Sequence, residues 1–219
     1  MRVGLLSDVH ANRVALSAVL EDMPPVDELV CAGDLVGYNP WPAAVVEEIR
    51  ERDVATVQGN HDRKLAAGQN FRGNEMAHAG IDHAREQLSA EQIDFLGELP
   101  TERTLFDGRL KVVHGHPEDP DRYTYPEDFG PHLLGEESVL VMGHTHVQHV
   151  EHTENGFVVN PGSVGQPRDR NPKAAYAVVD LDALDVTTHR VTYDIDAVKR
   201  GVAEANLPLQ TGERLTEGR

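Results

Sequence analysis

The stretch Val3-Gly-Leu-Leu-Ser-Asp-Val-His10 joins a short apolar run to a polar Asp-x-His tripeptide. A short apolar run bounded by polar residues is typical of a buried strand. From residue 12 to residue 21 the apolar side chains recur at helical spacing, which predicts a helix directly after that strand. The polar tripeptide is therefore expected where a buried strand ends and its crossover connection begins.

The alternation of strand and helix continues beyond this first unit. Residues 28–32 predict a second buried strand, Pro40-Trp-Pro42 predicts the start of a second helix, and residues 54–57 predict a third strand. Gly33 and Gly59 follow the second and third strands. A βαβαβ order of this kind predicts a parallel sheet with right-handed crossovers.

The second half of the chain has a different character. Residues 74–99 have a helical composition, with Ser89 and Pro100 as punctuation. Six closely spaced strands are predicted next, at residues 110–114, 139–142, 147–150, 157–160, 175–181 and 186–193. Residues 194–205 predict a closing helix capped by Asp194, and the polar residues 207–219 are expected to form a frayed tail.

The domain organisation follows from this pattern. No internal repeat or low-complexity linker divides the sequence, so we expect one domain over residues 1–219. A parallel half followed by a mostly antiparallel half predicts an α/β fold with two packed sheets flanked by helices.

The composition limits the classes of partner. Asp and Glu number 37 against 20 Lys and Arg, which gives a formal net charge of −17. This charge repels nucleic acid and anionic membranes, so we expect no stable nucleic-acid partner and no membrane partner. The basic residues are mostly arginine. An acidic, lysine-poor composition favours a halophilic source with molar internal salt over an ordinary, moderately acidic protein.

The compartment is inferred from cysteine usage and from the apolar runs. Cys31 is the single cysteine, which excludes an internal disulfide framework and a Cys-based zinc site, and we expect it to pack in the core. The first residues lack a secretory signal pattern, and no apolar run reaches the length of a membrane helix. These features predict a cytoplasmic protein.

Five predicted strand ends carry a carboxylate, an amide or an imidazole, usually beside a glycine. They are Asp8-x-His10, Gly33-Asp34, Gly59-Asn-His-Asp62, His114-Gly115 and Gly143-His144-x-His146. Each segment by itself also has a structural explanation as a turn, a helix cap or an exposed loop, and in the third segment Asn60 or Asp62 would be the cap. Because strand ends of a layered sheet meet at one edge, the set predicts a shared site there.

The predicted site offers oxygen and imidazole ligands and no thiolate. This donor set suits Mn²⁺, Fe²⁺, Zn²⁺ or Ni²⁺, with Mn²⁺ favoured, rather than a structural zinc cage. There are enough ligands for two ions that share one carboxylate. Two ions roughly 3.5–4 Å apart form a clamp for displacement at phosphorus.

In their order, these segments resemble the signature of the calcineurin-like metallophosphoesterases. The segments Gly33-Asp-Leu-Val-Gly-Tyr38 and Asn160-Pro-Gly-Ser-Val-Gly-Gln-Pro-Arg168 further resemble the small prokaryotic phosphodiesterase branch. The resemblance extends from the first strand to Val164 and implies a four-layer α/β/β/α sandwich of two mixed sheets flanked by helices.

The resemblance also implies a role for each matching residue. One metal would be held by Asp8, His10 and His146, the second by Asn60, His114 and His144, and Asp34 would bridge both. A hydroxide shared by two cations would attack phosphorus in line. His61 would act near the leaving oxygen as general acid or electrostatic stabiliser, with Asn60 as a further donor. The implied activity is that of a dinuclear metal-dependent phosphoesterase, most of all a phosphodiesterase, acting on a small phosphate ester.

The sequence departs from the family's serine/threonine phosphatases at one position. Those enzymes carry a second Asp that orients the catalytic histidine, and here that position is Gly37. Protein phosphatase activity is therefore not expected, and the group that orients His61 is left open.

Three further residues are candidates for substrate contact, each with a structural alternative. Asn12 either touches the site or caps the first helix, and His116 either contacts substrate or is an idle loop histidine. Arg168 either binds a phosphate or pairs with Asp169. Residues 71–83 and 117–131 are expected to determine specificity.

Two other functions compete with the phosphoesterase. One is a catalytically silent metal-binding scaffold, which is disfavoured because all seven ligand positions and His61 are filled. The other is a metal-dependent hydrolase of a non-phosphate ester, since the same hydroxide attacks a carbonyl.

Overall fold

Strand β1 (Arg2–Leu6) lies at the centre of a sheet, and its side chains are buried on both faces. In the computed structural model, which describes residues 1–219, Val3 and Leu5 point into one buried cluster and Leu6 into another. The strands of this first sheet lie in the order β10 (Asp185–Val191), β9 (Ala174–Asp180), β1, β2 (Glu28–Cys31) and β3 (Ala55–Thr56). Strands β1, β2 and β3 are parallel, whereas β9 and β10 pair antiparallel. The βαβαβ prediction is therefore confirmed.

The second sheet is also mixed. Its strands lie in the order β4 (Glu102–Leu105), β5 (Leu110–Val113), β6 (Val139–Val141), β8 (Gly156–Asn160) and β7 (His149–Thr153). Strands β5, β6 and β8 are parallel, and the edge strands β4 and β7 are antiparallel. The expectation of a mostly antiparallel second half is wrong for this sheet, because its central pairs are joined by long crossovers.

The helices begin where the sequence supplies a cap. Asn12, Asn74, Ser89 and Asp194 each accept a backbone N–H at a helix start through the side chain. The helices are α1 (Arg13–Asp22), α2 (Pro42–Glu51), α3 (Asn60–Ala66), α4 (Glu75–Gln87), α5 (Ala90–Glu98), α6 (Ile195–Glu204) and α7 (Gln210–Glu213), with the 3₁₀ helices η1 (Pro126–Asp128), η2 (Pro131–Leu133) and η3 (Arg214–Glu217).

Three apolar clusters fill the spaces between the layers. The central cluster joins the facing sides of the two sheets, for example Leu5 with Val112 and Val159. The largest cluster joins the other side of the first sheet to the helices and contains Cys31, as expected. The two mixed sheets and the helical layer confirm the predicted α/β sandwich.

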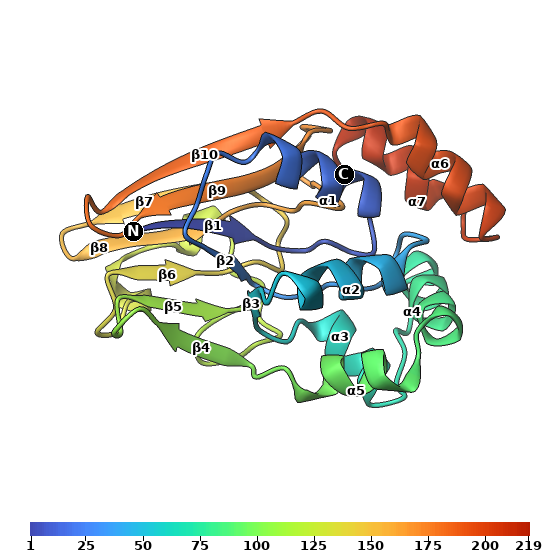
Figure 1. Ribbon diagram of the computed structural model, residues 1–219, viewed down its shortest axis with the longest axis horizontal. Helices are drawn as coiled ribbons and strands as arrows, with labels where there is room; N and C mark the ends of the chain where they lie inside the picture. The colour runs from blue at the N-terminus through green and yellow to red at the C-terminus, as the bar shows by residue number, and fades with distance from the viewer.

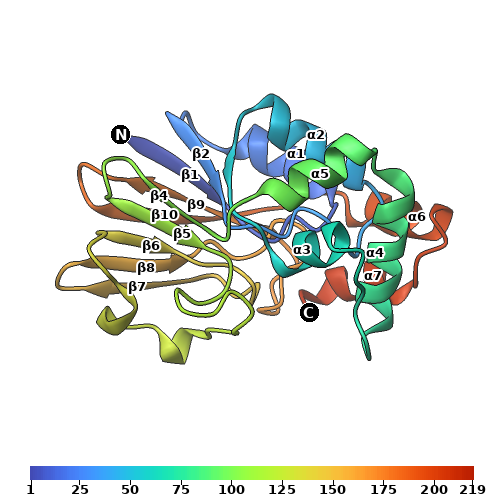
Figure 2. The same cartoon turned by 90° about the horizontal axis from the view of Figure 1, so that it is seen from below.

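The layer that covers the outer face of the second sheet is thin. Leu133 of η2 packs there against Val158 and Leu140. Figure 2 shows α1 and α2 over the first sheet, whereas short turns cover the second. The fourth layer thus consists of one-turn 3₁₀ helices.

Three local expectations differ from the structure. Strand β4 is not predicted, because its exposed positions are polar and it lies at an edge. Strand β7 lies two to three residues beyond the predicted range 147–150. The first of the two helix-cap candidates at residues 60 and 62 is instead the first residue of α3, since Gly59 is the cap.

The C-terminal segment is not the frayed tail predicted for residues 207–219. Residues 210–217 form α7 and η3, and Leu207 and Leu215 are buried against Val198 and Val202 of α6. Burial of these two leucines holds the segment against α6, although most of its other residues are polar.

The strand ends meet the helices in the middle of the molecule. Figure 1 shows β1 running from the N-terminus at the left toward this region, where α2 and α3 begin nearby. None of the helices is both long and apolar enough to cross a membrane.

Candidate metal centre

Sharp turns at the strand ends carry most of the predicted ligands. Asp8 and His10 follow β1, Asp34 follows β2, and His144 and His146 follow β6. All five residues have φ between 46° and 68°, in the left-handed region that non-glycine residues rarely adopt. Such conformations cost about 1–3 kcal/mol each and cluster at functional sites. The remaining two, Asn60 and His114, come from the start of α3 and the end of β5.

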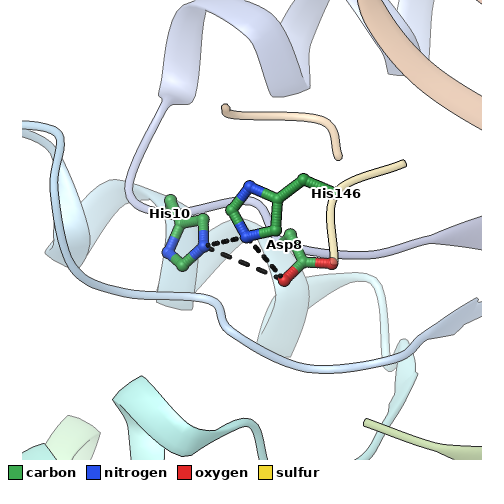
Figure 3. A group of neighbouring side chains, drawn as sticks. All are labelled: Asp8, His10 and His146. Atoms are coloured by element: carbon green, nitrogen blue, oxygen red, sulfur yellow. Dashed lines mark hydrogen bonds and ion pairs between the residues drawn. The ribbon is translucent and has the colours of Figure 1, made fainter. Parts of the chain in front are cut away.

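The first group of side chains consists of Asp8, His10 and His146 (Figure 3). The Nε2 atoms of His10 and His146 lie 3.0 Å apart, and Asp8 Oδ1 lies 3.2 Å from His146 Nε2 and 3.8 Å from His10 Nε2. All three side chains are at most 2% exposed. Asp8 Oδ1 has no hydrogen-bond donor, although it is buried.

The second group consists of Asp34, His114, His144 and Asn60. His114 Nε2 lies 3.1 Å from His144 Nδ1, 3.1 Å from Asn60 Oδ1 and 3.4 Å from Asp34 Oδ2. These atoms converge on one point between β5, β6 and α3.

Asp34 connects the two groups. Its Oδ2 atom lies 3.6 Å from His10 Nε2 in the first group and 3.4 Å from His114 Nε2 in the second. Its Oδ1 atom accepts the backbone N–H of His61 at 2.8 Å, which orients the carboxylate. One oxygen therefore faces both groups.

Backbone carbonyls fix the orientation of all four imidazoles. His10, His114 and His146 donate from Nδ1, to Val36 O (3.0 Å), Ala32 O (2.7 Å) and Gln166 O (2.6 Å), and His144 Nε2 donates to Asp121 O (3.2 Å). A carbonyl only accepts, so each of these ring nitrogens carries a proton. In a neutral ring the opposite nitrogen is then an unprotonated lone pair, and each of them points into the site.

In the first group the two lone pairs face each other without a donor between them. His10 and His146 present bare Nε2 atoms at 3.0 Å, beside the unpartnered Asp8 Oδ1. Such an electron-rich cluster is stable only around a positive charge. The residues therefore fit a divalent cation in each group.

The titration of the imidazoles agrees with this conclusion. Burial lowers the pKa of His10 to about 3 and that of His146 to about 4, so both rings are neutral. Burial also acts to lower the pKa of His114, but the carboxylates of Asp34 and Asp8 outweigh it and raise the pKa to about 10. Without a metal, a proton on His114 supplies the positive charge that the second group requires.

His61 lies beside His10 and Asp34, and these three side chains form a third cluster of possible ligand atoms, but its ring is held differently. Its ring packs 4.3 Å from Phe71, 4.9 Å from Tyr38 and 4.7 Å from His10, measured between centroids. Its Nδ1 atom is buried without a hydrogen-bond partner. A Cβ on Gly37 would lie 2.3 Å from that nitrogen. Aromatic packing, and not a carboxylate, thus orients His61.

Asp62 supports the site through the backbone and does not face the His61 ring. Its Oδ2 accepts the N–H groups of Asp34 (2.9 Å) and Gly59 (3.1 Å), and its Oδ1 accepts those of Leu35 (3.0 Å) and Val36 (3.3 Å). One buried carboxylate thereby ties the Asp34 turn to the start of α3.

Of the three candidates for substrate contact, Asn12 and His116 are engaged within the protein. Asn12 accepts Ala15 N–H and donates to Gly165 O, so its capping role is confirmed, and its side chain is fully buried. His116 Nδ1 accepts the N–H of Glu118, and the side chain lines a separate cavity of about 290 Å³. Neither belongs to the two groups.

Arg168 lies beside the site. Its guanidinium donates to Gln166 Oε1 (2.7 Å) and to the Tyr38 hydroxyl (3.2 Å). The alternative pairing with Asp169 is wrong, because that carboxylate pairs with Arg190. Arg168 therefore carries no acidic partner and remains a candidate for phosphate contact.

Three aromatic neighbours of the site were not predicted. Tyr38 and Phe71 flank His61, and the Tyr123 ring stacks 3.9 Å from that of His144. Phe71 and Tyr123 belong to residues 71–83 and 117–131, so both segments reach the site. Their irregular sequence carries no period that points to a particular side chain.

Together, two mixed sheets with His/Asp groups at their strand ends define a metal-binding α/β sandwich protein. The chain belongs to the calcineurin-like phosphoesterase superfamily, whose domain profile matches residues 1–184. The family and the His/Asp groups indicate divalent metal binding and support a phosphoester hydrolase.

Relatives with and without a named activity match most of the chain. An uncharacterized protein of Methanocaldococcus jannaschii is 30% identical, over 99% of this chain and 98% of the relative. The phosphodiesterase YfcE of Escherichia coli is 29% identical, over 85% of this chain and 91% of the relative. The crystal structure of a metallophosphoesterase from Sphaerobacter thermophilus is 35% identical, with a TM-score of 0.85 over 100% of this chain and 99% of that one.

Proposed function

We propose that the protein is a dinuclear metal-dependent phosphodiesterase that acts on a small phosphate ester. The observation that carries this proposal is the position of Asp34, whose Oδ2 faces a ring nitrogen of each group at 3.6 and 3.4 Å. A carboxylate shared in this way is suited to bridge two ions. The preference for diesters is supported by the likeness to YfcE.

The proposed ligands follow the two groups. One cation is held by Asp8, His10, His146 and the shared Asp34, and the other by Asn60, His114, His144 and the same Asp34. Two bound cations supply an ionised water near neutral pH and positive charge for the phosphoryl oxygens. Mn²⁺ is our first choice, since it accepts carboxylate, amide and imidazole ligands, and Ni²⁺, Fe²⁺ and Zn²⁺ are the alternatives.

His61 has its own role in the reaction. Attack in line places the entering oxygen opposite the ester oxygen, whose bond to phosphorus breaks. Burial lowers the pKa of His61 well below its usual value, so the ring is neutral and acts as an N–H donor. In this proposal the N–H donates a hydrogen bond that stabilises the negative charge developing on the leaving oxygen, and that oxygen takes its proton from water.

The size of the substrate and the location of the protein in the cell belong to the same proposal. The net charge of −17 favours a small substrate over a polynucleotide, and we place the protein in the cytoplasm of a salt-rich cell.

The test is metal-dependent hydrolysis by metal-stripped protein. Bis-p-nitrophenyl phosphate, p-nitrophenyl phosphate and p-nitrophenyl acetate are compared after addition of Mn²⁺, Ni²⁺, Zn²⁺ or Mg²⁺, at low and at molar KCl. We expect diester turnover with two metals per chain, and higher turnover in molar KCl. His61→Ala removes the N–H donor and is expected to lower kcat about 10²–10³-fold with the metal content retained.

The controls separate the competing functions. His152→Ala removes an exposed histidine of β7 outside the two groups and is expected to leave turnover unchanged. Metal-loaded protein that hydrolyses neither phosphate would instead support the silent scaffold. Turnover of the acetate alone would support the hydrolase of non-phosphate esters.

A further inference from the structure

Two exposed tyrosines lie beside the candidate metal centre. Tyr123 is 48% exposed and Tyr125 is 42% exposed, and the only other large hydrophobic side chains as exposed are Leu184 and Leu209. The Tyr123 ring stacks on His144 with centroids 3.9 Å apart, and Tyr125 lies parallel to Tyr123, at 6.1 Å and 14°. One of these four exposed side chains therefore stacks on a residue of the second group, and a second lies parallel to the first.

The segment that carries the tyrosines is tethered to the site. His144 donates from Nε2 to Asp121 O, and the Asp121 carboxylate pairs with Arg63 of α3. Thr124, between the two tyrosines, is buried. The two tyrosines thus flank a buried residue, and each keeps more than two fifths of its side chain exposed. Aromatic faces kept in water at a fixed place are typical of a binding surface.

We propose that Tyr123 and Tyr125 form a stacking platform for a nucleobase. We further propose, on the basis of the proposed function, that the substrates are small nucleotide phosphodiesters. Parallel rings offer flat faces, which suit a planar base better than an aliphatic group. In a nucleotide one sugar separates the base from the phosphate. A base stacked on the platform therefore leaves the phosphate free to extend toward the candidate metal centre beside His144. The acidic net charge of −17 disfavours a long polyanion but not a mono- or dinucleotide.

The binding test isolates the base from the phosphate. Calorimetry on the Mn²⁺-loaded protein compares AMP with ribose 5-phosphate, which has the same phosphate and no base. We expect AMP to bind about 5- to 150-fold more tightly, the range of stacking on an aromatic side chain. Tyr125→Leu is expected to reduce that ratio at least fivefold, whereas Tyr125→Phe keeps the ring and the ratio. Leu184→Ala, which removes an equally exposed side chain between β9 and β10, is the matched control.

The kinetic test uses two diesters with the same leaving group. Thymidine 5′-(p-nitrophenyl phosphate) and methyl p-nitrophenyl phosphate are compared by kcat/KM in the wild type and in Tyr125→Leu. We expect a preference for the thymidine ester that the variant loses.

Each outcome decides one of the two proposals. Equal affinities for AMP and ribose 5-phosphate, or an unchanged ratio in Tyr125→Leu, would overturn the platform. Hydrolysis of both diesters with equal kcat/KM would overturn it while the phosphodiesterase stands. Base-dependent binding lost in Tyr125→Leu, without hydrolysis of either diester, would support the platform and overturn the phosphodiesterase.

Discussion

Asp62→Asn is expected to damage both stability and metal binding, because four backbone N–H groups depend on this carboxylate. In either orientation the amide keeps one oxygen and turns its NH₂ toward two N–H donors. Two of the four hydrogen bonds, at 2.9–3.3 Å, are therefore lost in a side chain that is fully buried. A buried N–H left unsatisfied costs about 1–3 kcal/mol, which gives a loss of about 2–6 kcal/mol.

The assay combines unfolding with metal titration. For a chain of this size the loss corresponds to a fall in Tm of about 4–24 °C. Because Asp62 also holds the Asp34 turn, we expect Mn²⁺ affinity to fall about 10- to 100-fold. Asp94→Asn removes one exposed carboxylate from α5 and is expected to change neither quantity. Wild-type Tm and Mn²⁺ affinity in Asp62→Asn would refute the reasoning.

Three further predictions concern the His61 ring, the proton of the second group and the C-terminal segment. Gly37→Ala would place a Cβ 2.3 Å from His61 Nδ1, so we expect kcat for a diester to fall at least tenfold with metal content unchanged; full activity would contradict the packing role. The pKa of His114 is about 10 in the metal-free protein because, against the effect of burial, Asp34 favours the charged ring. A metal ion must therefore displace this proton, so metal affinity should rise with pH up to about 10, and about one proton should be released on binding at pH 7.5. Calorimetry in buffers of different ionisation enthalpy measures this release. A binding enthalpy that is the same in every buffer would rule it out. Leu215→Ala is expected to lower the free energy of unfolding by about 2–5 kcal/mol in urea, whereas a frayed tail would show no change.

The residues at the strand ends could be predicted because they carry a strong local signal. An apolar run followed by Asp, Asn or His, usually beside a glycine, recurs at these ends, and parallel topology brings such ends to one edge. The fold class and the family predicted from these residues are confirmed by the two mixed sheets and by the matching domain profile. The assignment of each ligand to one of two ions stays a prediction.

Other features depend on contacts that no local pattern encodes. The polar 207–219 segment contains Leu207 and Leu215, whose burial is visible only once α6 is in place. Strand β4 is half exposed at a sheet edge, so its apolar alternation is weak. The direction in which Asp62 points, toward the backbone of the Asp34 turn, follows from how α3 meets β2.

The long sequence separation within the site has a consequence for synthesis on the ribosome. The first group joins residue 8 to residue 146, and the carbonyl that orients His146 belongs to Gln166. Strand β9, which pairs with β1, ends only at Asp180. A nascent chain therefore carries Asp8 and His10 long before their partners emerge, and chains fold as domains once the necessary segments are available. Metal binding by the first group would thus follow translation of about four fifths of the chain.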